Sequence, residues 1–211
     1  MSKTKILQNH GEFEDDIESI MRYGLMVINA KWPGKTKKEA KKEKSMLLES
    51  LLLRSCARWE SFVENEMVLL VSMKPKKLNQ VMELPLDTKL SIRLTRALLF
   101  SDTYRSFYDI DRSKGTFRKF IEDEYNLFDQ IGGDRAKKMN FIYRIRNYLS
   151  HYSAFSRRKL LSAYKEIYGY RNFLEPGSFL LKQRGMHFEK LVHNFKLVSK
   201  SMLNELQRRI P

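Results

Sequence analysis

Residues 48–71, LESLLLRSCARWESFVENEMVLLV, decide the fold because their apolar side chains recur every three or four positions. The recurring positions are Leu48, Leu52, Cys56, Trp59, Val63, Met67 and Leu70. Since an α-helix makes one turn in about 3.6 residues, these side chains lie along one face of a helix. Thr36 and Glu39 have the spacing of a capping box at its start, and Pro75 ends it. The pattern therefore predicts one long helix over about residues 36–73.

The composition favours helices in the rest of the chain as well. Of 211 residues, 27 are Leu, whereas 7 are Val, 6 are Thr, 9 are Gly and 5 are Pro. Leucine favours helices, β-branched residues favour strands, and glycine and proline interrupt both. The longest apolar run, Met67–Val71, is far shorter than the ~20 residues of a membrane-spanning helix. The single cysteine, Cys56, excludes a disulfide framework within the chain, and we expect a soluble cytoplasmic protein in which it is a small core residue.

The same recurrence of apolar positions predicts further helices on both sides of the long one. Their approximate ranges are 12–30, 87–100, 116–129, 135–153, 157–169 and 186–208. Gly132-Gly133 breaks the chain before the helix at 135–153, with Asp134 as its N-cap, and Pro176-Gly177 marks a turn. Residues 101–115, which include three aromatic residues, read as a structured excursion between helices.

These elements predict an all-α bundle with a long second helix and a helical or irregular insertion in the middle. We expect a single domain over residues 1–211. Within it, residues 1–35 form an N-terminal helix and a linker, and residues 36–211 form the core.

Positive charge is concentrated in two parts of the chain, whose formal net charge is +15. Residues 134–211 hold 17 Lys/Arg and 5 Asp/Glu, a net charge of +12, which leaves +3 for residues 1–133. The segment Lys31–Lys44 holds seven Lys and two Glu, and it is either a solvated helix start or a loop that touches RNA. A basic half favours RNA or DNA as a partner ahead of a membrane surface, and a solvated surface without a ligand is the alternative.

The predicted helix over residues 135–153 carries the candidate site. Its apolar stripe consists of Ile142, Ile145, Leu149 and Tyr152, and one polar flank consists of Arg146, Asn147, Ser150 and His151. At about 100° per residue, Arg146 and His151 are the two edges of that flank, about 140° apart. Both side chains reach one phosphate only if the helix bends or ends near His151, if Arg146 extends around it, or if a second copy packs alongside.

The pattern Arg146-Asn147-x-x-x-His151 resembles the Arg-polar-x-x-x-His motif of the HEPN superfamily (higher eukaryotes and prokaryotes nucleotide-binding domain). The setting is also similar, because the motif lies late in a helical chain, after a long helix in which acidic Glu60 follows aromatic Trp59. The resemblance covers about residues 40–205. It implies a HEPN-like helical bundle and an endoribonuclease that needs no metal ion or other cofactor, of the kind found in toxin–antitoxin, abortive-infection and other anti-phage systems.

The resemblance also implies roles for individual residues. His151 would handle protons at the ribose 2′-hydroxyl or the leaving oxygen, Arg146 would stabilise charge on the phosphate, and Asn147 would orient one of them. Accessory residues would be Glu60, Ser150 and Tyr152. Independently of the resemblance, the positive charge of residues 134–211 predicts RNA contacts near the motif at Arg144, Arg157, Arg158 and Lys159. HEPN domains usually dimerise, so we expect a homodimer with both motifs in one cleft, and an antitoxin or another defence protein as a partner.

One feature of the motif departs from part of the family. HEPN toxins paired with a nucleotidyltransferase antitoxin often have His-x-Tyr, whereas Ser153 stands at that place here. We therefore do not expect regulation by modification of a tyrosine at that position.

A structural role for the same residues is the alternative. His151 near a helix end would favour the helix dipole, and Arg144 and Arg146 would be surface charges. The chain would then be a catalytically silent HEPN-like module that binds nucleic acid or a partner protein. His10, His187 and His193 are interpreted as structural or exposed, and the chain has no glycine-rich phosphate loop, no His-Glu-x-x-His and no cysteine cluster. We therefore expect neither nucleotide hydrolysis nor a zinc site.

Overall fold

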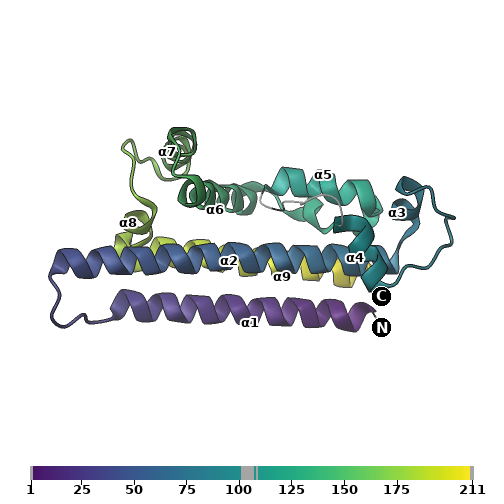
Figure 1. Cartoon of the computed structure of the whole chain (residues 1–211), viewed down its shortest axis with the longest axis horizontal. Helices are drawn as coiled ribbons and strands as arrows, with labels where there is room; N and C mark the ends of the chain where they lie inside the picture. Colours follow the sequence, from purple (N-terminus) through teal and green to yellow (C-terminus); the bar gives the residue numbers. More distant parts are fainter. Residues whose placement is uncertain (1, 101–106, 108, 210–211) are drawn as a thin grey trace.

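The structure is a computed structural model and describes residues 2–100, 107 and 109–209. Within these residues the chain forms nine α-helices, three short 3₁₀ helices and no strand, which confirms the all-α prediction. The long axis of the molecule is followed by α1 (Ser2–Asn29), α2 (Lys37–Met73) and α9 (Met186–Arg209) (Figure 1). The shorter helices are α3 (Lys76–Val81), α4 (Ile92–Phe100), α5 (Ile110–Phe120), α6 (Gly133–His151), α7 (Ala154–Tyr168) and α8 (Pro176–Leu180).

Helix α2 has the boundaries and the buried face that the sequence predicts. Thr36 Oγ1 accepts a hydrogen bond from the backbone N–H of Glu39, and the Glu39 carboxylate accepts one from the N–H of Thr36, so the capping box is formed. All seven residues of the predicted face are at most 2% exposed. Because α1, α4, α6, α8 and α9 all pack on α2, further residues off this face, such as Phe62 and Glu66, are also buried.

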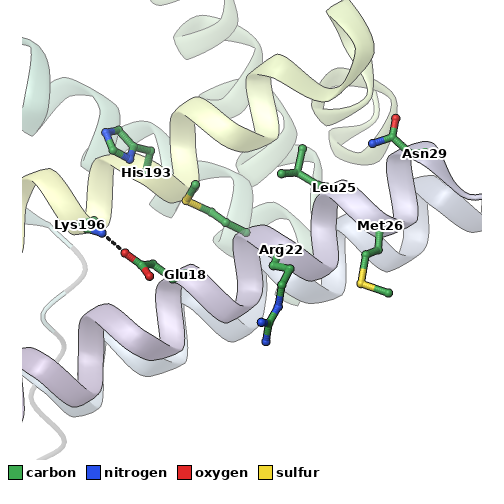
Figure 2. A pocket seen from close by; sticks show the side chains of 8 residues that line it. Glu18, Arg22, Leu25, Met26, Asn29, His193 and Lys196 are labelled. Carbon is green, nitrogen blue, oxygen red and sulfur yellow. Dashed lines mark hydrogen bonds and ion pairs between the residues drawn. The ribbon is translucent and has the colours of Figure 1, made fainter.

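Helix α1 begins about ten residues earlier than the prediction of 12–30. Its buried face starts at Ile6 and continues through His10 to Phe13. The imidazole of His10 is buried because its Nδ1 lies 2.9 Å from Ser199 Oγ and its Nε2 lies 3.2 Å from Glu66 Oε1. The apolar positions that predict this helix begin at Phe13, because the preceding position on the buried face is the polar residue His10. Helix α1 also lies along α9, to which it is linked by an ion pair between Glu18 and Lys196 (Figure 2).

The middle of the chain differs from the prediction in three places. Helix α4 begins at Ile92 instead of about residue 87, and it buries Thr95 and Leu99 while Leu94 is exposed. Helix α5 begins at Ile110, inside the predicted excursion, because Asp109 caps it by accepting from the N–H groups of residues 111 and 112. The predicted helix over 116–129 is instead the end of α5 followed by two 3₁₀ turns, Asp123–Tyr125 and Leu127–Gln130. Of the aromatic residues in the excursion, Phe107 is buried, while Tyr104 and Tyr108 lie outside the described residues.

The helices around the motif are close to their predicted ranges, with changes at their ends. The N-cap of α6 is Gly132 and not Asp134, which lies in the first turn and pairs with Lys138 at 2.6 Å. Helix α6 ends at His151 because Tyr152 is left-handed, with φ 45° and ψ 27°. Tyr152 is 66% exposed, so its predicted place on the buried stripe is wrong.

The elements after the motif show two further differences. Helix α7 begins at Ala154, three residues before its predicted start, because the hydroxyl of Ser153 caps it by accepting from the N–H of Ser156 at 3.1 Å. Pro176-Gly177 opens the short helix α8 instead of making a turn. Helix α9 is confirmed, and its inward residues Phe188, Leu191, Phe195, Val198 and Met202 are all fully buried.

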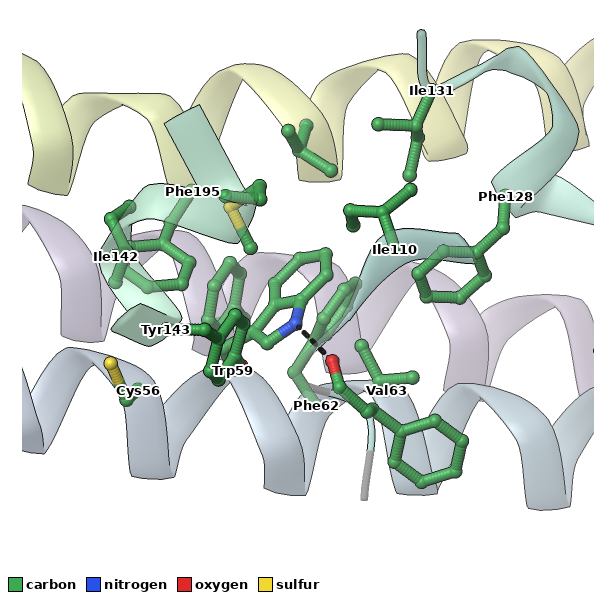
Figure 3. Close-up of a cluster of buried hydrophobic side chains, with 14 of the residues drawn as sticks. Cys56, Trp59, Phe62, Val63, Ile110, Phe128, Ile131, Ile142, Tyr143 and Phe195 are labelled. Carbon is green, nitrogen blue, oxygen red and sulfur yellow. Dashed lines mark hydrogen bonds between the residues drawn. The ribbon is translucent and has the colours of Figure 1, made fainter. Parts of the chain in front are cut away.

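The buried apolar residues form one cluster that extends from α1 to α9, with Trp59 at its centre (Figure 3). The indole ring is fully buried and lies against four phenylalanine rings, at centroid distances of 5.6 to 6.3 Å. Its Nε1 donates to the backbone oxygen of Phe107 at 3.3 Å. In the described part of the chain no helix is long and apolar enough to cross a bilayer.

Candidate functional site

A cavity of about 290 Å³ lies at the junction of α6 and α7. Its lining residues are Arg144, Asn147, His151, Ser153, Phe155, Ser156 and Lys159. Four of them are residues to which the sequence assigned a catalytic or RNA-binding role, namely Arg144, Asn147, His151 and Lys159. These seven residues, all within the described ranges, include no carboxylate, so the charged groups at the cavity are cationic.

Three lining side chains come from one face of α6. Arg144, Asn147 and His151 are separated by three and then four residues, which places them on successive turns of the same side. Arg144 is half-buried, whereas Asn147 and His151 are exposed. The sequence contains this spacing, although Arg144 was predicted as an RNA contact and not as a neighbour of His151.

The other wall of the cavity is the beginning of α7. The left-handed residue Tyr152 turns the chain so that Phe155 and Lys159 face the end of α6. Phe155 is 63% exposed, and Lys159 Nζ lies 5.5 Å from the centre of its ring. Ser156 is buried, and its hydroxyl donates to the backbone oxygen of Ser153 at 3.0 Å. The partial positive charge of a helix N-terminus adds to the cationic side chains, so this wall suits an anion.

Arg146, the first residue of the motif, lies outside this cavity. It is half-buried on the side of α6 that faces α2, and its Nη1 donates to Asn147 Oδ1 at 3.3 Å. Asn147 therefore contacts both Arg146 and the cavity, whereas Arg146 is not among the described residues that line the cavity of His151.

Glu60 lies on the same side as Arg146. Burial raises the pKa of the Cys56 thiol; the negative charge of Glu60 raises it further, and the positive charge of Arg146 lowers it. Both charged groups therefore lie within electrostatic range of the same buried thiol. Glu60 is half-buried and does not line the cavity of His151. Glu64, one turn further on, pairs with Arg96.

The two other accessory candidates also lie outside the cavity. Ser150 is exposed on α6. The exposed ring of Tyr152 lies 5.3 Å from the ring of Tyr148, whose hydroxyl donates to the carboxylate of Glu175 at 3.1 Å. Burial and the neighbouring Glu175 carboxylate raise the pKa of Tyr148. The side chain of Tyr148 is 6% exposed, so it belongs to the buried side of α6.

The predicted RNA contacts beyond the motif are arranged in two ways. Lys159 lines the cavity, whereas Arg157 lies over the ring of Phe173, with 4.2 Å between the guanidinium carbon and the ring centre. Arg158 is exposed on α7. Of the three consecutive basic residues, Lys159 is thus the one whose position suits a ligand in the cavity.

The donor set at the cavity suits a phosphodiester. A guanidinium and an ammonium bind phosphate oxygens, an imidazole exchanges protons near neutral pH, and an exposed phenyl ring offers a face to a base. The described residues contain no group of three or more His, Cys, Asp or Glu side chains with the arrangement of a metal site. Comparisons of the chain with protein-family models, curated proteins and solved structures found no match.

Proposed function

We propose that the protein is an endoribonuclease of the HEPN type that cleaves RNA, without a metal ion or other cofactor, in the cavity at the α6–α7 junction. The observation that carries the proposal is the convergence of Asn147 and His151 with Arg144 and Lys159 on one cationic cavity. In keeping with the resemblance of the motif, we assign it to the cytoplasmic toxins or anti-phage effectors, with an antitoxin or another defence protein as its partner.

The chemistry follows from the groups around the cavity. Arg144 and Lys159 hold the oxygens of the scissile phosphate. His151 takes the proton of the ribose 2′-hydroxyl, whose oxygen attacks the phosphorus and displaces the 5′-oxygen of the next nucleotide. The products are a 2′,3′-cyclic phosphate and a 5′-hydroxyl, and the leaving oxygen takes its proton from an acid or from water. Phe155 offers a stacking surface to a base beside the scissile bond.

Arg146 enters this proposal through a second copy of the chain. Within one chain it lies toward α2, on the other edge of α6 from His151. A two-fold interface is self-complementary, so one contact patch that includes the motif helix would bring two copies of the motif into one cleft. Each arginine would then stabilise charge on the phosphate held by the other chain. We therefore propose a homodimer as the active form.

The experiment that tests the function is cleavage of total RNA and of tRNA by the purified protein in excess EDTA. His151→Ala should abolish cleavage and leave the melting temperature near that of wild type, because His151 is exposed at the end of α6. His193→Ala is the matched control, since His193 is also exposed but lies on α9, away from the cavity. Full activity of His151→Ala, or no cleavage by wild type, would contradict the proposal.

The second candidate function is a catalytically silent HEPN-like module that binds RNA or a partner protein. The separation of Arg146 from the cavity favours it, because one chain then offers His151 without the motif arginine. The same experiment distinguishes the two functions. A silent module would bind RNA in a salt-dependent manner and cleave none, and His151→Ala would leave its affinity nearly unchanged.

A further inference from the structure

Exposed apolar side chains gather at the end of the α1–α2 hairpin. On α1, Tyr23 is 48% exposed and Met26 is 62% exposed, and on α2, Leu47 is 41% exposed. Leu25 and Met46 are exposed beside them. Such a patch costs free energy in water, and on a soluble protein a patch of this kind commonly marks a binding surface.

The patch is concave. A groove of about 530 Å³, here called the hairpin groove, is lined by Tyr23, Met26, Val27, Trp32, Leu47 and Leu51, with Arg54 at its edge. A second hollow, of about 610 Å³, lies on the other side of α1 against α9 and shares Met26 with the hairpin groove. Figure 2 shows Leu25 and Met26 on this stretch of α1, with His193 and Lys196 on the neighbouring α9.

The groove is bordered by positive charge that the chain does not neutralise. Residues 19–54 hold nine Lys/Arg and three Glu. Each of the three carboxylates already has a partner, because Glu39 closes the capping box, Glu43 pairs with Lys35, and Glu49 accepts from the N–H of Gly177. Five exposed lysines form no ion pair within the described residues, namely Lys31, Lys37, Lys38, Lys41 and Lys42.

We propose that the hairpin groove is the docking site for an acidic amphipathic helix of a partner protein. Apolar side chains of that helix, spaced three and four residues apart, would fill the groove between α1 and α2. Its carboxylates would lie against Arg54 and the unpaired lysines. The apolar face of the partner helix would then contact the apolar lining of the groove while its acidic face contacts the basic border. A bilayer is a less suitable partner because its flat surface contacts side chains that protrude from a protein, whereas the apolar side chains here line a groove. RNA has no aliphatic surface to fill it.

The docking site is independent of the proposed ribonuclease site. The hairpin groove and the cavity at the α6–α7 junction share no lining residue. In Figure 1, α1 and α7 lie on opposite sides of the layer that contains α2 and α9. The result of a binding experiment on the groove is therefore independent of whether the protein cleaves RNA.

The probe is a synthetic peptide of 18 residues, in which leucines follow the i, i+3, i+4, i+7 pattern and the remaining positions are glutamate. A peptide of the same composition in scrambled order is the control for charge alone. Binding to the full chain is followed by isothermal titration calorimetry and by tryptophan fluorescence, since Trp32 lines the groove and Trp59 is fully buried. The amphipathic peptide should bind at least tenfold more tightly than the scrambled one and shift the fluorescence.

Two double variants separate the groove from the surface in general. Met26→Glu with Leu47→Glu should weaken binding of the peptide at least tenfold, because two negative charges enter the apolar lining of the groove and repel glutamate. Leu86→Glu with Leu94→Glu is the matched control, since both leucines are also exposed, at 53% and 46%, but lie outside the groove. This control should bind the peptide within about twofold of wild type, and the circular dichroism spectra of both variants should match that of wild type.

Three results would overturn the proposal. The first is equal affinity for the amphipathic and the scrambled peptides, and the second is full affinity in the groove variant. The third is evidence that the groove binds something else. Vesicles of phosphatidylcholine and phosphatidylserine, or an RNA oligonucleotide, would then bind wild type but not the groove variant. Alternatively, sedimentation would show a homodimer for wild type and for the control variant, and a monomer for the groove variant.

Discussion

Replacing Gly177 with alanine perturbs the contact that holds α8 against α2. A Cβ atom at this position would lie 2.5 Å from Ser45 Cβ and 2.7 Å from the backbone oxygen of Ser45, whereas ordinary contacts begin at 3.4 Å. The two helices would have to separate by about 0.7–0.9 Å. The N–H of Gly177 donates to Glu49 Oε1 at 2.6 Å, so the same movement would stretch a hydrogen bond.

The magnitude follows from these two losses. Overpacking of a rigid contact costs ~1–3 kcal/mol, and a lost intramolecular hydrogen bond adds ~0.5–1.5 kcal/mol. The higher helix propensity of alanine returns at most ~1 kcal/mol. We therefore expect a net loss of ~0.5–4.5 kcal/mol in the free energy of unfolding. For a chain of this size, that loss lowers the melting temperature by ~1–18 °C.

Gly115→Ala is the matched control because its Cβ would meet nothing within 4 Å, although Gly115 also lies inside a helix, α5. This variant should raise the free energy of unfolding by ~0.5–1 kcal/mol, so the two substitutions have opposite signs. Thermal unfolding at neutral pH, followed by circular dichroism, measures both. A Gly177→Ala protein at least as stable as wild type would refute the close packing of α8 on α2.

Three further predictions concern the core, the pH dependence and the cationic cavity. Trp59→Ala should lower the free energy of unfolding by ~3–5 kcal/mol in a denaturant titration, because it empties the centre of the core, and a loss below ~1 kcal/mol would contradict this. Burial of Glu49, with Glu175 nearby, raises the pKa of the Glu49 carboxyl in the folded protein. The stability that the protonated carboxyl contributes is therefore fully present below the pKa of the unfolded chain, and it is lost as pH rises through the pKa of the folded protein. Glu49→Gln should therefore melt close to wild type near pH 4 and above wild type at about pH 7; the reverse order at pH 7 would contradict this. Arg144→Gln with Lys159→Gln should weaken binding of single-stranded RNA and reduce the slope of log affinity against log salt by about 1.4, and an unchanged slope would move the RNA path elsewhere, to Lys35–Lys44 first.

The long helices could be predicted from the sequence because their burial follows a regular period. Helix α2 has seven apolar positions in register and a local capping box, and both are readable without knowledge of the fold. The first ten residues of α1 were missed because His10 occupies a core position. Its partners, Glu66 and Ser199, are 56 and 189 residues away in the chain, and no local pattern contains them.

The candidate site divides in the same way. Asn147 and His151 were found by their spacing on one helix, and the structure places both at the cavity. Lys159 joins them because Tyr152 adopts a left-handed conformation, which tyrosine seldom does, so the turn could not be read from its sequence. The separation of Arg146 from His151 was expected from their angle on the helix. Of these two residues, only His151 lines the cavity.

The most direct test of the ribonuclease proposal is a comparison of wild type and His151→Ala on an unstructured RNA oligonucleotide, with product ends identified by mass spectrometry. We expect a 2′,3′-cyclic phosphate, no cut where a single 2′-deoxynucleotide replaces the ribose at the cleavage site, and a rate for His151→Ala that is lower by ~10²–10⁴-fold. Cleavage at the deoxy position, a 3′-hydroxyl product, or an unchanged rate in His151→Ala would refute the ribonuclease proposal.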